Sequence, residues 1–159
     1  MSVREFELYI RDLLEHPEVQ RLHQARRHHF RRDRFEHSYA VAKLAWRMTK
    51  FVHGNAAVAA RAGLLHDWYH DHDPHFRKFF RPDTHHFRKS VAAATAYGEH
   101  QDVIHAIRTH YWPYGRMVPR TREAWIVWMA DNVVWLVDAW QSFKQAARDG
   151  VHYVVYGKV

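Results

Sequence analysis

The sequence predicts an all-α protein that folds as one domain, and three observations lead to this prediction. The chain has 159 residues, the length of one ordinary domain. Hydrophobic residues make up 47% of it, which is enough to build a core and argues against disorder. Apolar side chains recur at helical spacing through nearly every segment, as they do in helices that pack on a core.

Charge and cysteine content narrow the possible chemistry. The formal net charge is +7 with histidine counted as neutral, which favours anionic partners such as phosphates and nucleotides. The chain has 16 histidines and no cysteine, so disulfides, thiolate zinc sites and cysteine nucleophiles are excluded. The N-terminus has no apolar signal core, and the most apolar run, residues 124–137, is too short to span a bilayer. We therefore expect a cytoplasmic protein without a membrane partner.

Four helices are predicted in the first half of the chain. Residues 6–14 have helical periodicity, and residues 18–29 follow as a second short helix. The segment 35–52 has the strongest pattern and ends at His53-Gly54-Asn55. The alanine-rich segment 56–67 is apolar nearly all round, so we expect it to be buried.

A loop and three further helices are predicted in the second half. The segment 68–84 contains two prolines among many histidines and aspartates, and its length suggests a functional role. We expect Gly150 to end the last helix and the tail 151–159 to form a short strand or an extended arm. The total is about six or seven helices, and those of the second half span residues 86–97, 101–110 and 122–148.

A histidine and an aspartate stand side by side at the end of the buried segment 56–67. His66 and Asp67 follow an apolar run, and a buried charged pair is costly unless something compensates it. A divalent metal ion would do so, because imidazole nitrogen and carboxylate oxygen are both good ligands. His37 lies on the core-facing stripe of the segment 35–52, so it is a candidate to complete such a site.

The predicted helical faces separate inward histidines from outward ones. His86 lies on the apolar side of its helix, whereas His85 lies on the charged side. In the same way, His110 aligns with apolar residues and His105 with polar ones. Asp131 stands in an apolar helix, where an aspartate should be paired or metal-bound. Taken singly, each histidine is better explained as a hydrogen-bonded core residue, and Asp131 equally well as an ion pair or a cap. Together they predict a metal site with these ligands: His37, His66, Asp67, His86, His110 and Asp131.

This ordered set resembles the pattern of the HD-domain metal-dependent phosphohydrolases. In that family a histidine on an early helix precedes an adjacent His-Asp pair, up to two further histidines and a late aspartate. The similarity covers roughly residues 20–145, and the chain is most similar to the small stand-alone bacterial members regarded as hydrolases. The resemblance implies a single HD domain over residues 1–159 that folds as a helical bundle.

The resemblance also implies how the ligands are shared. His37, His66, Asp67 and Asp131 would hold one metal ion, and Asp67 would bridge to a second ion held by His86 and His110. The two ions would lie ~3.5–4 Å apart. Histidine and carboxylate ligands suit Fe, Mn, Zn, Co or Ni better than Mg, and Fe or Mn is expected first.

The implied reaction is hydrolysis of a small phosphate ester such as a nucleotide. The two cations would lower the pKa of a bridging water, and the resulting hydroxide would attack phosphorus. Lys89, Arg88 and Arg77 would bind the substrate and stabilise the added negative charge, although each is also explained as a surface charge. His85 or His70 would protonate the leaving group. Asp67, His85 and Lys89 are then the expected catalytic residues.

Two other functions stay open at this point. A minority of HD proteins cleave a carbon bond with O₂ at the same ligand set, so a di-iron oxygenase is one alternative. A metal-binding signalling module without turnover is the other. Trp68, Trp112 and Tyr114 would either stack on a nucleobase or belong to the core. No recognised nucleic-acid-binding motif appears, so we expect no nucleic-acid partner, and nothing in the sequence sets the oligomeric state.

Overall fold

The computed structural model describes residues 3–24, 32–69 and 86–156, and the regular elements within these ranges are all helical. The all-α prediction is therefore confirmed. In chain order the elements are α1 (Val3–Leu8), α2 (Arg11–Leu14), α3 (Pro17–Gln20), the 3₁₀ helix η1 (Arg21–Gln24), α4 (Arg34–Val52), α5 (Ala56–Leu65), α6 (His86–Tyr97), α7 (Gln101–Thr109) and α8 (Arg122–Tyr156).

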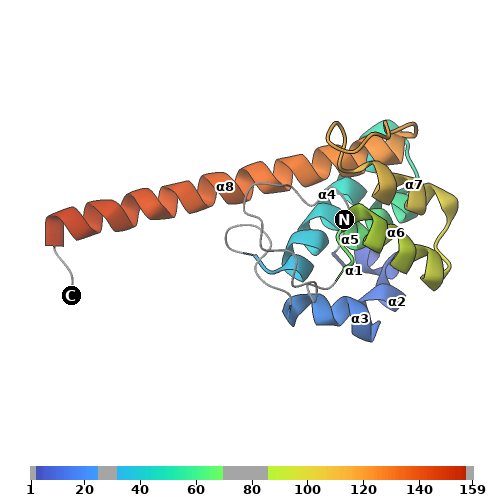
Figure 1. Cartoon of the computed structure of the whole chain (residues 1–159), viewed down its shortest axis with the longest axis horizontal. Helices are drawn as coiled ribbons and strands as arrows, with labels where there is room; N and C mark the ends of the chain where they lie inside the picture. Colours follow the sequence, from blue (N-terminus) through green and yellow to red (C-terminus); the bar gives the residue numbers. More distant parts are fainter. Residues whose placement is uncertain (1–2, 25–31, 70–85, 157–159) are drawn as a thin grey trace.

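The helices α4 and α5 lie at the centre of the bundle, and α7 and the first part of α8 pack against them (Figure 1). A capping box starts α4: Asp33 accepts a hydrogen bond from the Glu36 backbone, and the Glu36 carboxylate accepts one from the Asp33 backbone. The helix ends at His53, which adopts the left-handed conformation. The Asn55 side chain then caps the first turn of α5, so the turn predicted at 53–55 is confirmed.

The N-terminal segment is more broken than its periodicity indicates. The single helix expected over residues 6–14 is two short helices, α1 and α2, separated at Tyr9 and Ile10. Ile10 is fully buried at this break, so burial of its side chain fixes the bend. The helix expected over 18–29 is present as α3 and η1 as far as Gln24, and its remainder lies outside the described residues.

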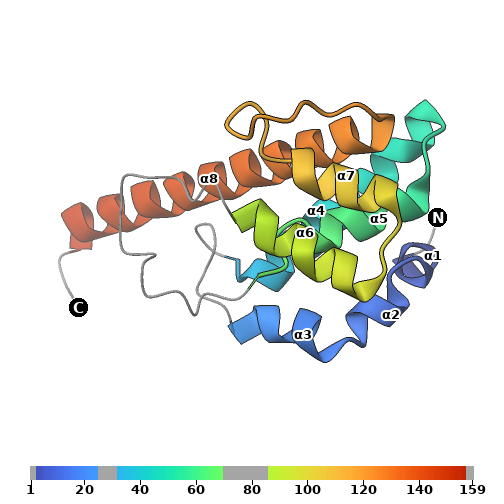
Figure 2. The same ribbon diagram turned by 45° about the vertical axis from the view of Figure 1, so that its right-hand side comes forward.

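The last helix is longer than its sequence suggests. The prediction that Gly150 ends it is wrong, because α8 continues to Tyr156, and so the expected strand or arm is helical instead. A glycine inside a helix costs only about 1 kcal/mol relative to alanine, which the turns on either side outweigh. The far end of α8 projects well beyond the bundle (Figure 2). None of the described helices is both long and apolar enough to cross a membrane.

A glycine sets the distance between α4 and α5. A Cβ atom at Gly63 would lie 2.6 Å from the Ala42 Cα and 2.9 Å from the Ala42 backbone nitrogen. Both are backbone atoms of α4, so no side-chain rotation could relieve the overlap. Only glycine allows the two helices to cross this closely.

Gly63→Ala should therefore lower the free energy of unfolding by about 1–3 kcal/mol, the usual cost of overpacking a tight contact. For a chain of this size we expect the Tm to fall by several degrees, measured by circular dichroism. Gly115→Ala is the matched control, because its Cβ would meet atoms only at 3.5 Å or more. Equal Tm values for the two variants would contradict the close approach.

Arg61 of α5 ties the N-terminal segment to the turn between α6 and α7. Its guanidinium donates two hydrogen bonds of 2.8 Å to the Asp12 carboxylate and others to Glu99. The hydroxyl of Tyr97 donates a further hydrogen bond of 3.1 Å to Asp12. The hydrogen bond from Arg61, opposed by partial burial, lowers the pKa of Asp12 to about 2.

A lowered pKa contributes stability above the unfolded value, here about 3.8, and the contribution is lost as the pH falls towards about 2. The stability difference between wild type and Asp12→Asn should therefore shrink as the pH falls from about 4 to about 2. Urea titrations at a series of pH values measure this difference, with Glu15→Gln as a control for the loss of one exposed carboxylate. A difference that stays constant over this range would argue against the Arg61 pairing.

Candidate metal centre

The first residue of the site is His37, on the second turn of α4. The Asp33 capping box fixes where α4 begins, and this register turns His37 into the interior, where its side chain is fully buried. Its Nε2 atom lies 3.0 Å from Oδ1 of Asp131, which comes from α8. The side chain of Asp131 is 23% exposed, so the centre opens to solvent beside this residue.

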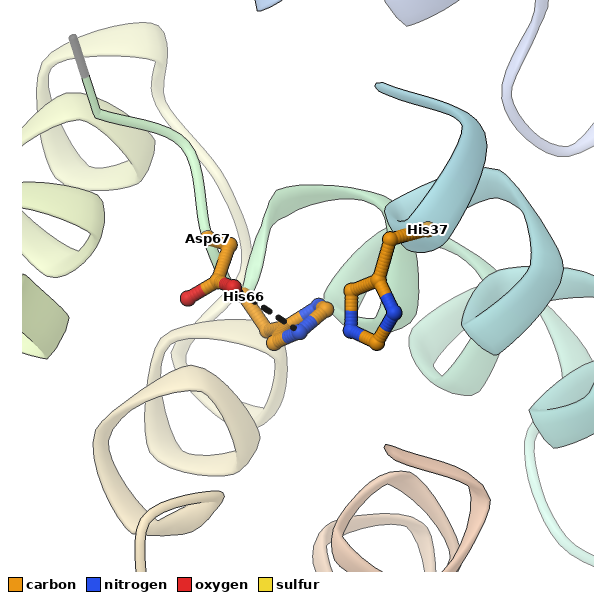
Figure 3. A group of neighbouring side chains, drawn as sticks. All are labelled: His37, His66 and Asp67. Atoms are coloured by element: carbon orange, nitrogen blue, oxygen red, sulfur yellow. Dashed lines mark ion pairs between the residues drawn. The ribbon is translucent and has the colours of Figure 1, made fainter. Parts of the chain in front are cut away.

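His66 and Asp67 follow the end of α5 and lie close to His37 (Figure 3). Both are buried. The His66 Nδ1 atom lies 2.8 Å from the carbonyl oxygen of Gly63, and a carbonyl only accepts, so Nδ1 carries the proton. The Nε2 atom consequently faces the carboxylates, 3.6 Å from Oδ2 of Asp67 and 3.6 Å from Oδ1 of Asp131. The last turn of α5 thus fixes both the orientation and the tautomer of His66.

His110 repeats this arrangement at the end of α7. Its Nδ1 atom donates a hydrogen bond of 2.7 Å to the carbonyl oxygen of Ile107, and its Nε2 atom lies 3.9 Å from Oδ1 of Asp67. The ring centroids of His110 and His66 are 5.0 Å apart, and those of His66 and His37 are 5.4 Å apart. Three imidazoles from three parts of the chain therefore surround two carboxylates.

The electrostatics of the centre follow from this crowding. Burial alone would lower the pKa of His66, but the carboxylates of Asp67 and Asp131 outweigh burial and raise this pKa to about 9. Burial alone would raise the pKa of Asp131, but His66 and His37 hold it well below its ordinary value. The carboxylate charge thus requires a positive partner, which is either a proton on His66 or a cation.

The residues present fit a metal ion. Two overlapping groups each bring three ligand atoms within 4.8 Å of one another: His37 with His66 and Asp67, and His66 with His110 and Asp131. The buried Nε2 atom of His66 makes no hydrogen bond to any described residue, although it faces two carboxylates. Backbone carbonyls hold the other nitrogen of His66 and of His110, as they commonly do for histidines that bind metals. The donor set of nitrogen and oxygen suits a divalent transition metal.

The structure thus brings together five of the six predicted ligands, and the sixth lies at the edge of what is described. His86 is the first residue of α6, but its side chain is outside the described residues. His85, His70 and Arg77 are also outside them. Arg88 and Lys89 are exposed on the first turn of α6, and their contact with a substrate stays a prediction.

The aromatic residues next to the site separate into core and surface. Trp68 is buried and packs edge-to-face on Tyr97 and His16, so it belongs to the core. Trp112 packs on two tryptophans of α8 and is half-buried. Tyr114 is exposed and is the one of the three with a ring open to solvent.

Sequence reasoning missed Arg34. This side chain is buried in the first turn of α4, one turn before His37, and donates a hydrogen bond of 2.7 Å to the Tyr69 carbonyl. Its guanidinium also lies 3.9 Å from the centroid of the Tyr69 ring. Arg34 thereby fixes the position of Tyr69, two residues after Asp67. The signal in the sequence was weak, because an arginine that closely follows two others, Arg31 and Arg32, is usually a surface residue.

Comparison with known proteins agrees with this geometry. The chain matches the HD domain family over residues 34–136, which include all five clustered side chains. The chain therefore belongs to the HD-domain family. That membership places it in the superfamily of metal-dependent phosphohydrolases, whose HD domains bind divalent metal ions.

Two curated relatives are both called ribonuclease Y. The protein from Symbiobacterium thermophilum is 36% identical over 80% of this chain, and that from Desulforudis audaxviator is 35% identical over 62%. The matched part is 23% of the first relative and 17% of the second, so the chain spans less than a quarter of either. No solved structure matches the chain.

Removing the metal should destabilise the protein, because a ligand bound only to the native state stabilises it by mass action. A chelator should lower the Tm of the wild type, and added Mn²⁺ should restore it. A metal at 100 times its dissociation constant contributes about 2.7 kcal/mol, which corresponds to a Tm shift of roughly 5–10 °C at this size. Differential scanning calorimetry measures both effects.

Asp131→Asn should respond much less to the chelator, since it weakens the site and removes the charge that needs a cation. His105→Ala is the control: His105 lies outside the cluster, where it accepts a hydrogen bond from the Arg120 backbone. A wild-type Tm that ignores both chelator and Mn²⁺ would make the cluster a structural ion-pair network.

Proposed function

We propose that this protein is a metal-dependent phosphohydrolase that cleaves a small phosphate ester, with nucleotides as the first class to test. The observation that supports this most is the meeting of His37, His66, Asp67, His110 and Asp131 in one buried cluster. These side chains come from α4, the end of α5, the end of α7 and α8, and they follow the order of the family pattern.

The proposed ligand roles rest on the two faces of Asp67. Its Oδ2 atom faces His66 at 3.6 Å, and its Oδ1 atom faces His110 at 3.9 Å. A carboxylate with one oxygen toward each histidine suits a bridge between two ions. We assign His37, His66, Asp67 and Asp131 to the first ion, and Asp67, His110 and His86 to the second.

When bound, two ions such as Fe or Mn would supply Lewis acidity and a water of lowered pKa as the nucleophile. The chain supplies the rest. The partly exposed Asp131 lies on the solvent side of the centre, so substrate would enter there. Lys89, Arg88 and Arg77 are the proposed cations for the phosphoryl oxygens, and His85 is the proposed acid for the leaving group.

An RNA phosphodiester is the second candidate substrate, and a specific observation favours it. Both relatives are called ribonuclease Y, and the first is 36% identical over most of this chain. The formal net charge of +7 would attract a polyanion in the same way as a small phosphate. A small ester and an RNA strand would use the same centre, so the substrates must be compared directly.

The test is a hydrolysis screen of the metal-loaded protein with nucleotides, bis(p-nitrophenyl) phosphate and a single-stranded RNA oligonucleotide. Asp67→Ala should lower kcat/KM by at least about 10³-fold, which corresponds to about 4 kcal/mol of transition-state stabilisation. His110→Ala should lose one of two ions by elemental analysis, whereas His105→Ala should keep both ions and the activity.

Each outcome of this screen bears on a different part of the proposal. Release of inorganic phosphate or of a nitrophenolate supports a small ester, and shortening of the oligonucleotide supports RNA. Metal binding without any hydrolysis would leave a binding module and overturn the proposed activity. Full activity in Asp67→Ala would show that the chemistry lies elsewhere.

A further inference from the structure

The outer face of α8 carries an apolar stripe that the bundle does not cover. Five large side chains of this stripe are 40–64% exposed, and the smaller Ala147 is exposed as well. Monomeric proteins rarely leave so much contiguous apolar surface in water. We call these residues the α8 seam: Met129, Val133, Leu136, Trp140, Phe143 and Ala147.

The spacing of the α8 seam is that of a coiled coil. Successive members are four, three, four, three and four residues apart, which is the a/d pattern of a heptad repeat. The opposite face of the same helix holds Asp131, Val134 and Asp138, which turn toward the bundle. The helix therefore has two apolar faces, and among the described residues only one of them is buried against the bundle.

The distal part of α8 needs support that the bundle does not give. Every residue from Phe143 to Arg148 is exposed, and this part of the helix projects away from the bundle (Figures 1 and 2). A lone helix of a few turns is marginal in water, because most helical stability comes from packing. The rings of Trp140 and Phe143 stack with their centroids 5.9 Å apart, so they already form a small apolar surface.

We propose that the α8 seam pairs with the α8 seam of a second copy of this chain, in antiparallel orientation. A twofold axis midway between Leu136 and Trp140 would place Leu136 of one copy against Trp140 of the other copy. The same axis would place Val133 against Phe143, and Met129 against Ala147. The seam is thus complementary to itself, as a twofold interface must be.

The area of the α8 seam is sufficient for this pairing. Side chains of this size that are about half exposed present roughly 100 Å² each. The five large side chains of the two copies together would then bury about 1,000 Å², close to the smallest area of a specific protein interface. We therefore expect a dimer that dissociates at low concentration.

Charge favours the antiparallel over the parallel orientation. Under the same twofold axis Lys144 would lie opposite Asn132 of the other helix, and Val137 opposite Ala139, so no like charges meet. The chain as a whole carries a formal net charge of +7. Antiparallel pairing places the two bundles at opposite ends of the helix pair, whereas parallel pairing would place them side by side.

Analytical ultracentrifugation of the full chain over a range of concentrations tests the pairing. The wild type should change from monomer to dimer, and Leu136→Glu should raise the dissociation constant by about tenfold or more, as expected at the centre of an interface. Gln145→Glu adds the same charge to α8 outside the seam and should leave the dimer intact. Trp140→Gln is a second, uncharged variant, and circular dichroism checks that each variant is folded.

Single cysteines test the orientation, because the chain has none of its own. Met129→Cys and Ala147→Cys chains, mixed and treated with a short bismaleimide, should form a crosslinked heterodimer. Neither variant alone should crosslink, since identical positions would lie about 27 Å apart along the helices. A monomer at all concentrations, a dimer indifferent to Leu136→Glu, or crosslinking of each variant only with itself would overturn the proposal. So would a monomer that uses the seam to bind lipid vesicles.

Discussion

The close crossing of α4 and α5 is the constraint on which the site depends. Gly63 lets the two helices approach until a side chain would overlap the backbone at Ala42. The carbonyl oxygen of the same residue accepts a hydrogen bond from Nδ1 of His66. Gly63 therefore sets both the separation of α4 and α5 and the orientation of the His66 imidazole. A shift of α5 would move His66 and Asp67 away from His37 together, so packing and ligand geometry cannot vary independently here.

Charge balance is the second constraint, and it explains why the cluster is built of imidazoles. Asp67 and Asp131 lie close enough to the same histidine to raise its pKa to about 9. A lysine or arginine in that position would compensate the carboxylates permanently. An imidazole gives up its proton and then offers a lone pair, so the same side chain balances the charge without metal and binds metal when it is present. The charge of the centre can thus be balanced both with and without a bound metal ion.

The sequence predicted the fold better than its details. Helical periodicity found α4 to α7 within a residue or two at most ends, because their caps and glycines are local signals. It also placed His37, His66, Asp67, His110 and Asp131 on inward faces, since burial follows the same period. Arg34 was missed because burial of an arginine depends on a distant carbonyl, that of Tyr69. The true end of α8 was missed because Gly150 is a local signal that the rest of the helix overrides.

The helical period of α8 places one set of side chains toward the bundle and a second, apolar set on the outer face. Asp131 and Asp138 are seven residues apart, so they fall on the same face, and that face is turned to the bundle. Leu136, Trp140 and Phe143 then fall on the opposite face by the same geometry. Hydrophobicity alone would predict that all these apolar residues are buried, and it predicts the same for the apolar run 124–137. The exposed half has a different explanation, because a helix whose apolar residues exceed what its own domain can cover has surface left for another chain. Any partner on that outer face would therefore touch the same helix that carries Asp131 on its inner face.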